Sequence, residues 1–288
     1  MTGFVFNTSA SVVCEPGAVQ KLNELTLNTI GKRVFLVSDK GLVNAGVVDP
    51  VVAQLEAAGV HVTVFDEVVA DPPEAVVLQG VQCARAAKVD GVIGLGGGSS
   101  LDVAKLVALL VGGGEQLSDI YGVGMAKGKR LPLILIPTTA GTGSEVTPIS
   151  IITTGETEKK GVVAPQLLPD VALLDADLTL GLPPHVTAAT GIDAMVHAIE
   201  AYTSTSVNNN PISRMLAKEA LRLLGANIEK AVNTPRDKEA RSNMLLGSML
   251  AGQAFANSPV QRCMHWLIRS AGSSMWRTAF PTRWCCPM

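Results

Sequence analysis

Apolar positions along the first 183 residues follow two different patterns. Continuous apolar runs bounded by turn residues, which are typical of buried parallel strands, occur at 33–38, 92–95 and 133–136. Shorter runs predict further strands at 4–6, 11–14, 61–65, 149–153 and 171–174. Helical spacing predicts helices at 18–27, 48–58, 74–88 and 101–110. Strands that alternate with helices predict a doubly wound α/β domain with a mostly parallel sheet, which binds ligands at the carboxyl ends of its strands.

From Pro184 onward the pattern is helical only. Long stretches with helical spacing cover 184–203, 211–224 and 237–256. Pro211 stands at a helix start, where its missing N–H costs nothing. The sequence therefore predicts an α/β domain over residues 1–183 and an incomplete all-α domain over residues 184–260.

Composition narrows the class of protein. The chain has 288 residues, of which 47% are hydrophobic and 17% charged, and its net charge is −2, so it is neither disordered nor marked as a nucleic-acid binder. Its apolar stretches are too short to cross a bilayer, and its start lacks the regions of a signal peptide. Five cysteines in this length do not indicate a disulfide framework. We expect a cytoplasmic protein with no membrane and no nucleic-acid partner.

A glycine-rich turn joins the strand at 92–95 to the next helix. Gly96, Gly97 and Gly98 allow close approach of a ligand, and Ser99 adds a hydroxyl. Free N–H groups at a helix start form a cradle for an anion such as a pyrophosphate. A tight turn without a ligand is an equal alternative, because the spacing departs from the standard dinucleotide fingerprint.

Two further polar positions follow neighbouring predicted strands. The segment 137–147, PTTAGTGSEVT, places hydroxyls and glycines after the strand at 133–136. Asp39 closes the strand at 33–38, where a carboxylate can bind a ribose hydroxyl and repel an additional phosphate. A turn-capping aspartate is an equal alternative for Asp39.

A candidate metal pair lies in the predicted helix at 184–203. Asp193 and His197 are four residues apart, so they project from one face of the helix and can share a ligand. Carboxylate and imidazole suit Fe²⁺ or Zn²⁺. A surface ion pair is the competing interpretation, and two ligands do not complete a metal site.

Four motifs in this order resemble the iron-containing (group III) alcohol dehydrogenases: GGGSSLDVAK, PTTAGTGSEVT, KKGVVAPQLLPDVALLD and GIDAMVHAIEAY. The resemblance implies an N-terminal dinucleotide-binding domain, a C-terminal helical metal-binding domain, and an active site between them. It also implies hydride transfer between a small or primary alcohol and NAD, helped by a divalent metal, Fe²⁺ or Zn²⁺. The reverse reaction reduces an aldehyde. The specific alcohol is not identified, and a homo-oligomer stays open.

The resemblance also assigns roles to individual residues. Asp39 favours NAD over NADP, and Asp193 and His197 are the first two metal ligands. No catalytic residue is assigned. The remaining cofactor contacts that it implies are Gly96, Gly97, Gly98, Ser99, Thr138, Thr139, Thr147, Asp71 and Lys160.

The last 28 residues depart from the family pattern. They hold all three tryptophans, four arginines and no acid, and no apolar period organises them. A basic, aromatic arm for a partner is one interpretation. However, codons allowed for the segment after Val260 spell Ala-Val-His-Ala-Leu-Ala-Tyr-Pro when read two bases later, and then a His-Gly pair, which are the missing family segments. We therefore interpret 261–288 as an out-of-frame tail that follows loss of one base near the Val260 codon.

The frame interpretation predicts a chain with half a metal site, weak metal binding, little turnover and a tendency to aggregate. A catalytically silent NAD-binding fragment is the main alternative. A glycerol-dehydrogenase-like or dehydroquinate-synthase-like enzyme is another.

Overall fold

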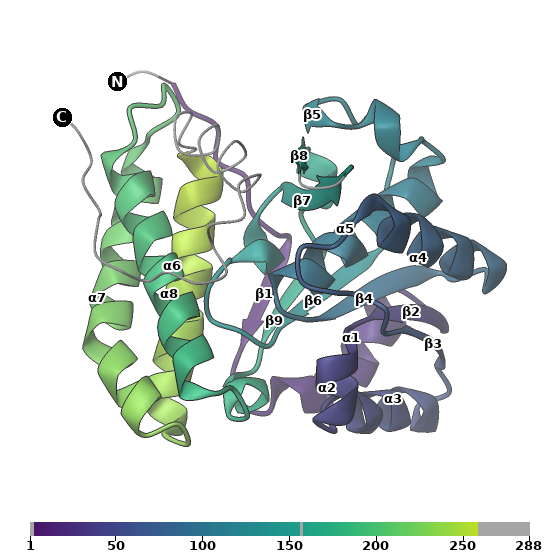
Figure 1. Ribbon diagram of the computed structural model, residues 1–288, viewed down its shortest axis with the longest axis horizontal. Helices are drawn as coiled ribbons and strands as arrows, with labels where there is room; N and C mark the ends of the chain where they lie inside the picture. Colours follow the sequence, from purple (N-terminus) through teal and green to yellow (C-terminus); the bar gives the residue numbers. More distant parts are fainter. Residues whose placement is uncertain (1–2, 156–157, 259–288) are drawn as a thin grey trace.

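The computed structural model describes residues 3–155 and 158–258, with strands and helices alternating first and helices alone at the end (Figure 1). In these residues the strands are β1 (Ser11–Cys14), β2 (Arg33–Val37), β3 (His61–Phe65), β4 (Gly91–Gly96), β5 (Gly122–Val123), β6 (Leu133–Pro137), β7 (Ile149–Thr154), β8 (Glu158–Val163) and β9 (Val171–Leu174). The α-helices there are α1 (Leu22–Thr29), α2 (Lys40–Asn44), α3 (Val48–Ala57), α4 (Glu74–Ala86), α5 (Gly98–Gly113), α6 (Pro184–Thr203), α7 (Pro211–Asn233) and α8 (Lys238–Asn257).

The main sheet is parallel throughout. Its strand order is β1-β9-β6-β4-β2-β3, and each neighbouring pair runs in the same direction. The central strands β4 and β6 are buried along their whole length, which explains their continuous apolar sequences. The predicted α/β class with a mostly parallel sheet is confirmed.

Helices cover both faces of this sheet (Figure 1). Successive side chains of β2 point to opposite faces, so Phe35 and Val37 pack in the core beneath α4 and α5. Val34 and Leu36 pack on the other side, with apolar residues of α1 and α3. The two cores fix β2, β3 and β4 side by side, and their carboxyl ends therefore meet at one edge.

A second, three-stranded sheet has the order β5-β8-β7. The strand predicted at 149–153 belongs to it, as β7, and pairs antiparallel with β8. The expectation that this strand joins the alternating α/β pattern is therefore wrong. A hairpin connects β7 to β8, so no crossover helix can place them in the parallel sheet.

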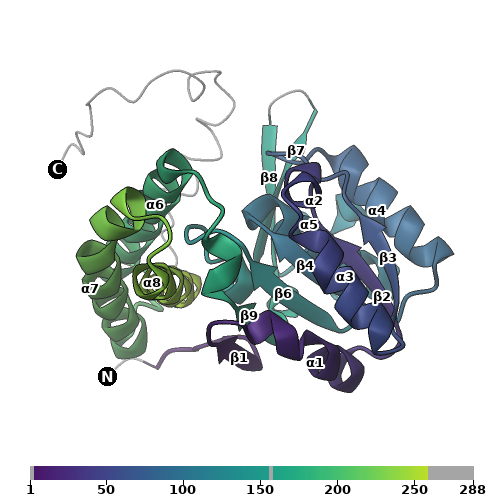
Figure 2. The ribbon, with the colours of Figure 1, turned by 90° about the horizontal axis from the view of Figure 1, so that it is seen from below.

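The helices α6, α7 and α8 pack beside the sheet (Figure 2). Pro184 and Pro211 occupy first-turn positions, and Asn210 forms a reciprocal capping box with Ser213. The core of this helical region is mostly alanine, which allows the helix axes to approach closely. The all-α character predicted from residue 184 onward is confirmed for the part that the structure describes.

Several predicted boundaries differ from the structure. No strand forms at residues 4–6, α5 begins at Gly98 rather than at residue 101, and α7 continues to Asn233 rather than ending at 224. The short helix α2 was not predicted. The proposed out-of-frame tail at 261–288 lies outside the described residues. Within them, no helix has the length and hydropathy needed to cross a membrane.

Candidate functional site

The carboxyl ends of β2, β3 and β4 enclose a cavity of about 420 Å³. It is therefore at the place where parallel α/β sheets bind ligands. Asp39, Gly97, Gly98 and Ser99, four of the predicted cofactor residues, line it. The other lining residues are Lys40, Gly41, Asp66, Glu67, Val68, Val69, Ala70 and Ser100.

The glycine-rich turn between β4 and α5 is built so tightly that side chains do not fit at two positions. Gly96 has a φ of 156°, and a Cβ on it would lie 2.7 Å from the Ser100 side chain. A Cβ on Gly98 would lie 2.7 Å from the Thr142 side chain. Gly97 is the N-cap of α5, and no side chain of the described residues bonds to the first N–H groups of this 16-residue helix, so these groups are available to a ligand. The geometry fits an anion such as a pyrophosphate.

Asp39 performs a structural task while it lines the cavity. Its Oδ1 accepts a hydrogen bond of 3.1 Å from the Leu42 N–H and caps α2. Its Oδ2 accepts one of 3.4 Å from the Ser100 hydroxyl. Both donors are neutral, and the carboxylate has lone pairs left for a further donor. The two interpretations of Asp39, helix cap and ribose ligand, are compatible in one geometry.

Two predicted threonines border the same turn. The Thr138 N–H donates to the Gly96 carbonyl oxygen at 2.9 Å, which joins the segment after β6 to the glycine-rich turn. A Cβ on Gly97 would lie 3.7 Å from the Thr139 side chain. The structure therefore brings Thr138 and Thr139 to the glycine-rich turn.

Thr147 instead belongs to a buried polar cluster around Lys105. The Lys105 ammonium is fully buried and donates to Ser144 Oγ at 2.7 Å, to the Ile149 carbonyl at 2.8 Å and to Thr147 Oγ1 at 3.3 Å. Asp102 Oδ1 lies 3.5 Å from the same nitrogen. This cluster joins α5 to the segment 137–147. Sequence reasoning missed it, although Asp102 and Lys105 are charged residues inside an otherwise apolar helix.

Glu145 is a second buried charge at this cluster. Burial raises the pKa of Glu145 to about 7, although the nearby Lys105 opposes the shift. Burial also lowers the pKa of Lys105, against the pull of Asp102 and Glu145. Within the described residues, the Glu145 Oε1 atom has no hydrogen-bond partner.

Asp71 and Lys160 do not line the cavity. Asp71, with a φ of 54°, follows the cavity residue Ala70, but its carboxylate is 80% exposed and pairs with Lys159 at 2.5 Å. The ammonium of Lys160 lies 5.3 Å from the centre of the Tyr121 ring. The hairpin thus directs Lys159, rather than Lys160, toward Asp71.

The predicted metal pair forms on α6. Asp193 Oδ1 lies 3.8 Å from His197 Nε2, and the His197 ring packs against Phe255 of α8 with centroids 5.1 Å apart. The Asp193 side chain is 51% exposed and the His197 side chain 20%. Among residues 3–155 and 158–258, no group of three or more His, Cys, Asp or Glu side chains could hold a metal ion.

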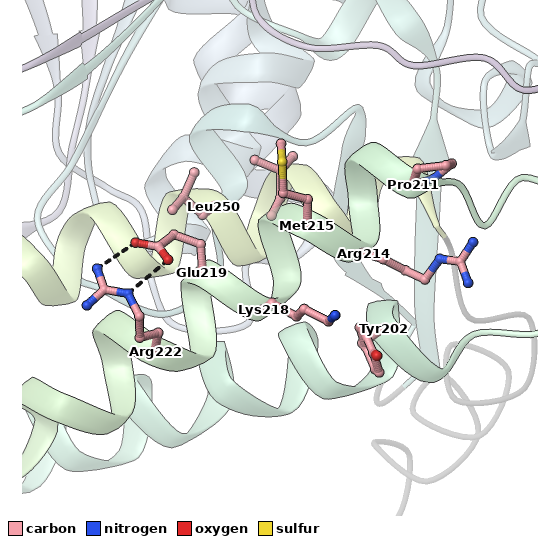
Figure 3. Close-up of a pocket in the computed structure, with 9 residues that line it drawn as sticks. Tyr202, Pro211, Arg214, Met215, Lys218, Glu219, Arg222 and Leu250 are labelled. Carbon is pink, nitrogen blue, oxygen red and sulfur yellow. Dashed lines mark hydrogen bonds and ion pairs between the residues drawn. The ribbon is translucent and has the colours of Figure 1, made fainter.

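A larger groove, of about 760 Å³, lies on the helical region (Figure 3). Its walls carry apolar and basic side chains, and Glu219 and Arg222 form an ion pair of 2.6 Å along it. The lining residues are Tyr202, Pro211, Arg214, Met215, Leu216, Lys218, Glu219, Arg222 and Leu250. None of them is a predicted cofactor or metal residue.

Family models match both the α/β region and the helical region. Residues 9–176 match the family model for iron-containing alcohol dehydrogenase, and residues 187–272 match the model for the C-terminal part of that family. The second match extends past residue 260, into the segment that the structure does not describe.

Individual relatives agree with the family models. The chain is 46% identical to long-chain-alcohol dehydrogenase 1 of Geobacillus thermodenitrificans, over 85% of the chain and 62% of that protein. It is 38% identical to sulfoacetaldehyde reductase of Bilophila wadsworthia, over 88% of the chain and 66% of that protein. A crystal structure of 1,3-propanediol oxidoreductase superposes with a TM-score of 0.89 at 33% identity, over 94% of this chain and 70% of that one. The chain therefore spans slightly less than two thirds of these two sequence relatives.

Proposed function

The chain belongs to the iron-containing alcohol dehydrogenase family, and we propose that its α/β region binds NAD for hydride transfer to or from a small or primary alcohol. The observation that carries this proposal is the cavity at the ends of β2, β3 and β4, which is lined both by the start of α5 and by the Asp39 side chain. The named relatives act on alcohols or aldehydes, which supports the substrate class.

The residues around this cavity fit the parts of a dinucleotide. The N–H groups at the start of α5, after Gly96 and Gly97, would hold the pyrophosphate. The Asp39 carboxylate would accept hydrogen bonds from a ribose diol. Thr138 and Thr139 would border the pyrophosphate.

Thr147, Asp71 and Lys160 remain proposed contacts with less support. Thr147 is engaged with the buried Lys105, and Lys160 lies over Tyr121. We also keep residues 1–183 and 184–260 as the proposed dinucleotide-binding and metal-binding domains. A cytoplasmic location and a homo-oligomer stay predictions.

NAD supplies the hydride acceptor when bound, and the protein positions it. Preformed contacts at the pyrophosphate and ribose would fix the nicotinamide end relative to the helical region, so part of the ordering cost is met before the reaction. The cluster around Lys105 contributes indirectly, because it holds the segment that carries Thr138 and Thr139 against α5.

The described residues do not complete a metal site for Fe²⁺ or Zn²⁺. Asp193 and His197 supply two ligands, while catalytic sites in proteins use three protein ligands and structural sites four. We propose that the chain binds metal weakly and turns over slowly, in agreement with the interpretation of 261–288 as an out-of-frame tail.

A catalytically silent NAD-binding protein is the second candidate, and the two-ligand pair on α6 favours it. A test that separates the candidates uses the purified 288-residue chain with Fe²⁺ or Zn²⁺ and short primary alcohols. Retained metal well below one per chain, with NADH binding but negligible NADH production, would support the silent candidate. About one metal per chain with turnover would support the enzyme and contradict the weak-metal proposal.

Reading the codons of the gene tests the tail separately. If the codons after Val260, read two bases later, do not spell the family segment, the frameshift interpretation fails. A substrate panel that includes glycerol distinguishes the glycerol-dehydrogenase-like alternative.

A further inference from the structure

The proposed ribose end of the cavity is more acidic than Asp39 alone makes it. Three carboxylates line it, those of Asp39, Asp66 and Glu67, against the single ammonium of Lys40. The Lys40 ammonium is already paired with Glu67 at 2.7 Å. Lys40 also interacts with the charge of Asp66, so one cation faces three carboxylates and the lining keeps an excess of negative charge.

The strand register places Asp66 beside the Asp39 segment. Val37 at the end of β2 is in register with Phe65 at the end of β3, and the Ser38 N–H donates to the Phe65 carbonyl oxygen at 2.9 Å. Asp39 then forms an isolated backbone bridge with Glu67. Asp66 lies between these two links. In the described part of the chain, the Asp66 carboxylate has no hydrogen bond and no ion pair within 4 Å, and it acts on the Lys40 ammonium only at longer range.

We propose that Asp66 is a second specificity-determining residue, which acts with Asp39 to exclude a dinucleotide that carries a 2′-phosphate. The inference rests on the proposed NAD site. A 2′-phosphate carries close to two negative charges at neutral pH, and its repulsion from each carboxylate adds to that from the other. The ribose diol of NAD is neutral, so Asp66 leaves NAD binding almost unchanged.

The test compares NADH and NADPH by fluorescence titration of the full chain, which requires neither metal nor turnover. We expect Asp66→Asn to tighten NADPH binding roughly fivefold, because one repulsion near the surface is removed, and to change NADH binding less than about twofold. Glu229→Gln is the matched control, because it removes one charge from an exposed position on α7. We expect it to move both affinities by less than about twofold.

A second variant keeps the test independent of the folding of Asp66→Asn. Glu67→Gln removes one of the three carboxylates and the closest partner of Lys40, so we expect it also to tighten NADPH binding. Raising the salt concentration from about 0.05 M to about 0.5 M should bring the NADPH and NADH affinities of the unmodified chain closer together.

Two results would overturn the inference while the NAD site stands. One is an NADPH affinity in Asp66→Asn that moves no more than in Glu229→Gln. The other is a loss of NADH affinity in Asp66→Asn as large as in Asp39→Asn, which would make Asp66 a ribose ligand. A chain that binds no NADH at all would overturn the proposed function, and the inference with it.

Discussion

The α/β region and the helical region differ in how completely their chemistry is assembled. In the α/β region, adjacent strand ends bring Asp39 and the glycine-rich turn to one cavity, and the sheet is covered on both faces. Among the described residues of the helical region, Asp193 and His197 form a pair without a third ligand, and several large apolar side chains on α6 and α7 are exposed, Met215 among them. A site at a sheet edge needs only neighbouring strands, whereas a metal site in a helix bundle needs residues from several helices.

The two cores also differ in composition. The cores of the sheet are dominated by valine, leucine and isoleucine, whereas the core of the helices is mostly alanine. Each buried alanine removes less apolar area from water, so the helical core gains less stabilisation per residue. We therefore expect the helical region to open first on unfolding, with native-state hydrogen exchange as the measurement.

Substitution of one buried cation in each region should give the largest change in unfolding free energy. Lys105→Met removes three hydrogen bonds and the cation beside Asp102, and leaves that carboxylate with the neutral Ser144 hydroxyl and Ile151 N–H as donors. We therefore expect a loss of about 3–5 kcal/mol in unfolding free energy. Arg241 of α8 is equally buried, but it donates to the Thr187 hydroxyl and the Pro235 carbonyl, which are neutral. Arg241→Met should therefore cost only about 1–3 kcal/mol in urea unfolding. Equal losses in the two variants would contradict this view of the Lys105 cluster.

The next prediction concerns the contact between α8 and the segment 137–147, where the two regions meet. Gly252 of α8 faces the backbone of the segment 137–147, and a Cβ on it would lie 2.8 Å from Gly143 Cα. Gly252→Ala should therefore destabilise the chain by about 1–3 kcal/mol, because backbone atoms cannot move aside as a side chain can. Gly225→Ala on α7 is the control, since its Cβ would meet nothing within 4 Å, and it should stabilise by about 0.5–1 kcal/mol. Thermal unfolding of both variants decides, and a stabilising Gly252→Ala would show that the regions are not in tight contact.

The pH dependence of stability tests the buried carboxyl near this junction. Burial raises the pKa of Glu145 from 4.5 to about 7, so the folded chain holds this proton more tightly than the unfolded chain. The contribution of Glu145 to stability is present below pH 4.5 and is lost as the pH rises to about 7. We expect Glu145→Gln to be more stable than the unmodified chain at about pH 8, by on the order of 1–2 kcal/mol, and nearly equal at about pH 5. A difference that does not vary with pH would contradict the assignment, and Glu229→Gln provides the exposed control.

The smallest expected effect separates the two tasks of Asp39. Asn is as good a helix cap as Asp, so Asp39→Asn should leave the unfolding free energy within about 0.5 kcal/mol. Loss of charged hydrogen bonds to the ribose should nevertheless weaken NADH binding roughly tenfold. Unchanged NADH affinity would make Asp39 a helix cap only. Parallel unfolding and fluorescence titrations of the same variant provide the answer.

The parallel sheet could be predicted because its central strands are buried on both faces and therefore have continuous apolar sequences, as in 33–38 and 133–136. The hairpin of β7 and β8 could not, because 149–153 resembles those strands while its partner 158–163 begins with charged residues. The helix α2 was missed because its five residues are too short to show a period.

The candidate site, too, could be predicted only in part. The glycines at 96–98 and Asp39 could be found because both follow predicted strands, and the structure brings them together. The partners of Lys105 could not, because they come from a segment about 40 residues away and only the folded chain shows the contact. Adjacent residues of β8 point to opposite faces of the sheet, so only the structure shows that Lys159, and not Lys160, pairs with Asp71.

The most direct test of the central claim is a fluorescence titration of the 288-residue chain with NADH, with and without a metal chelator. The claim is that the proposed cofactor site of the α/β region binds NADH without a metal at the Asp193–His197 pair. It predicts saturable binding at about one NADH per chain, with the same affinity in the presence of chelator. Absence of binding, or binding that the chelator abolishes, would contradict it.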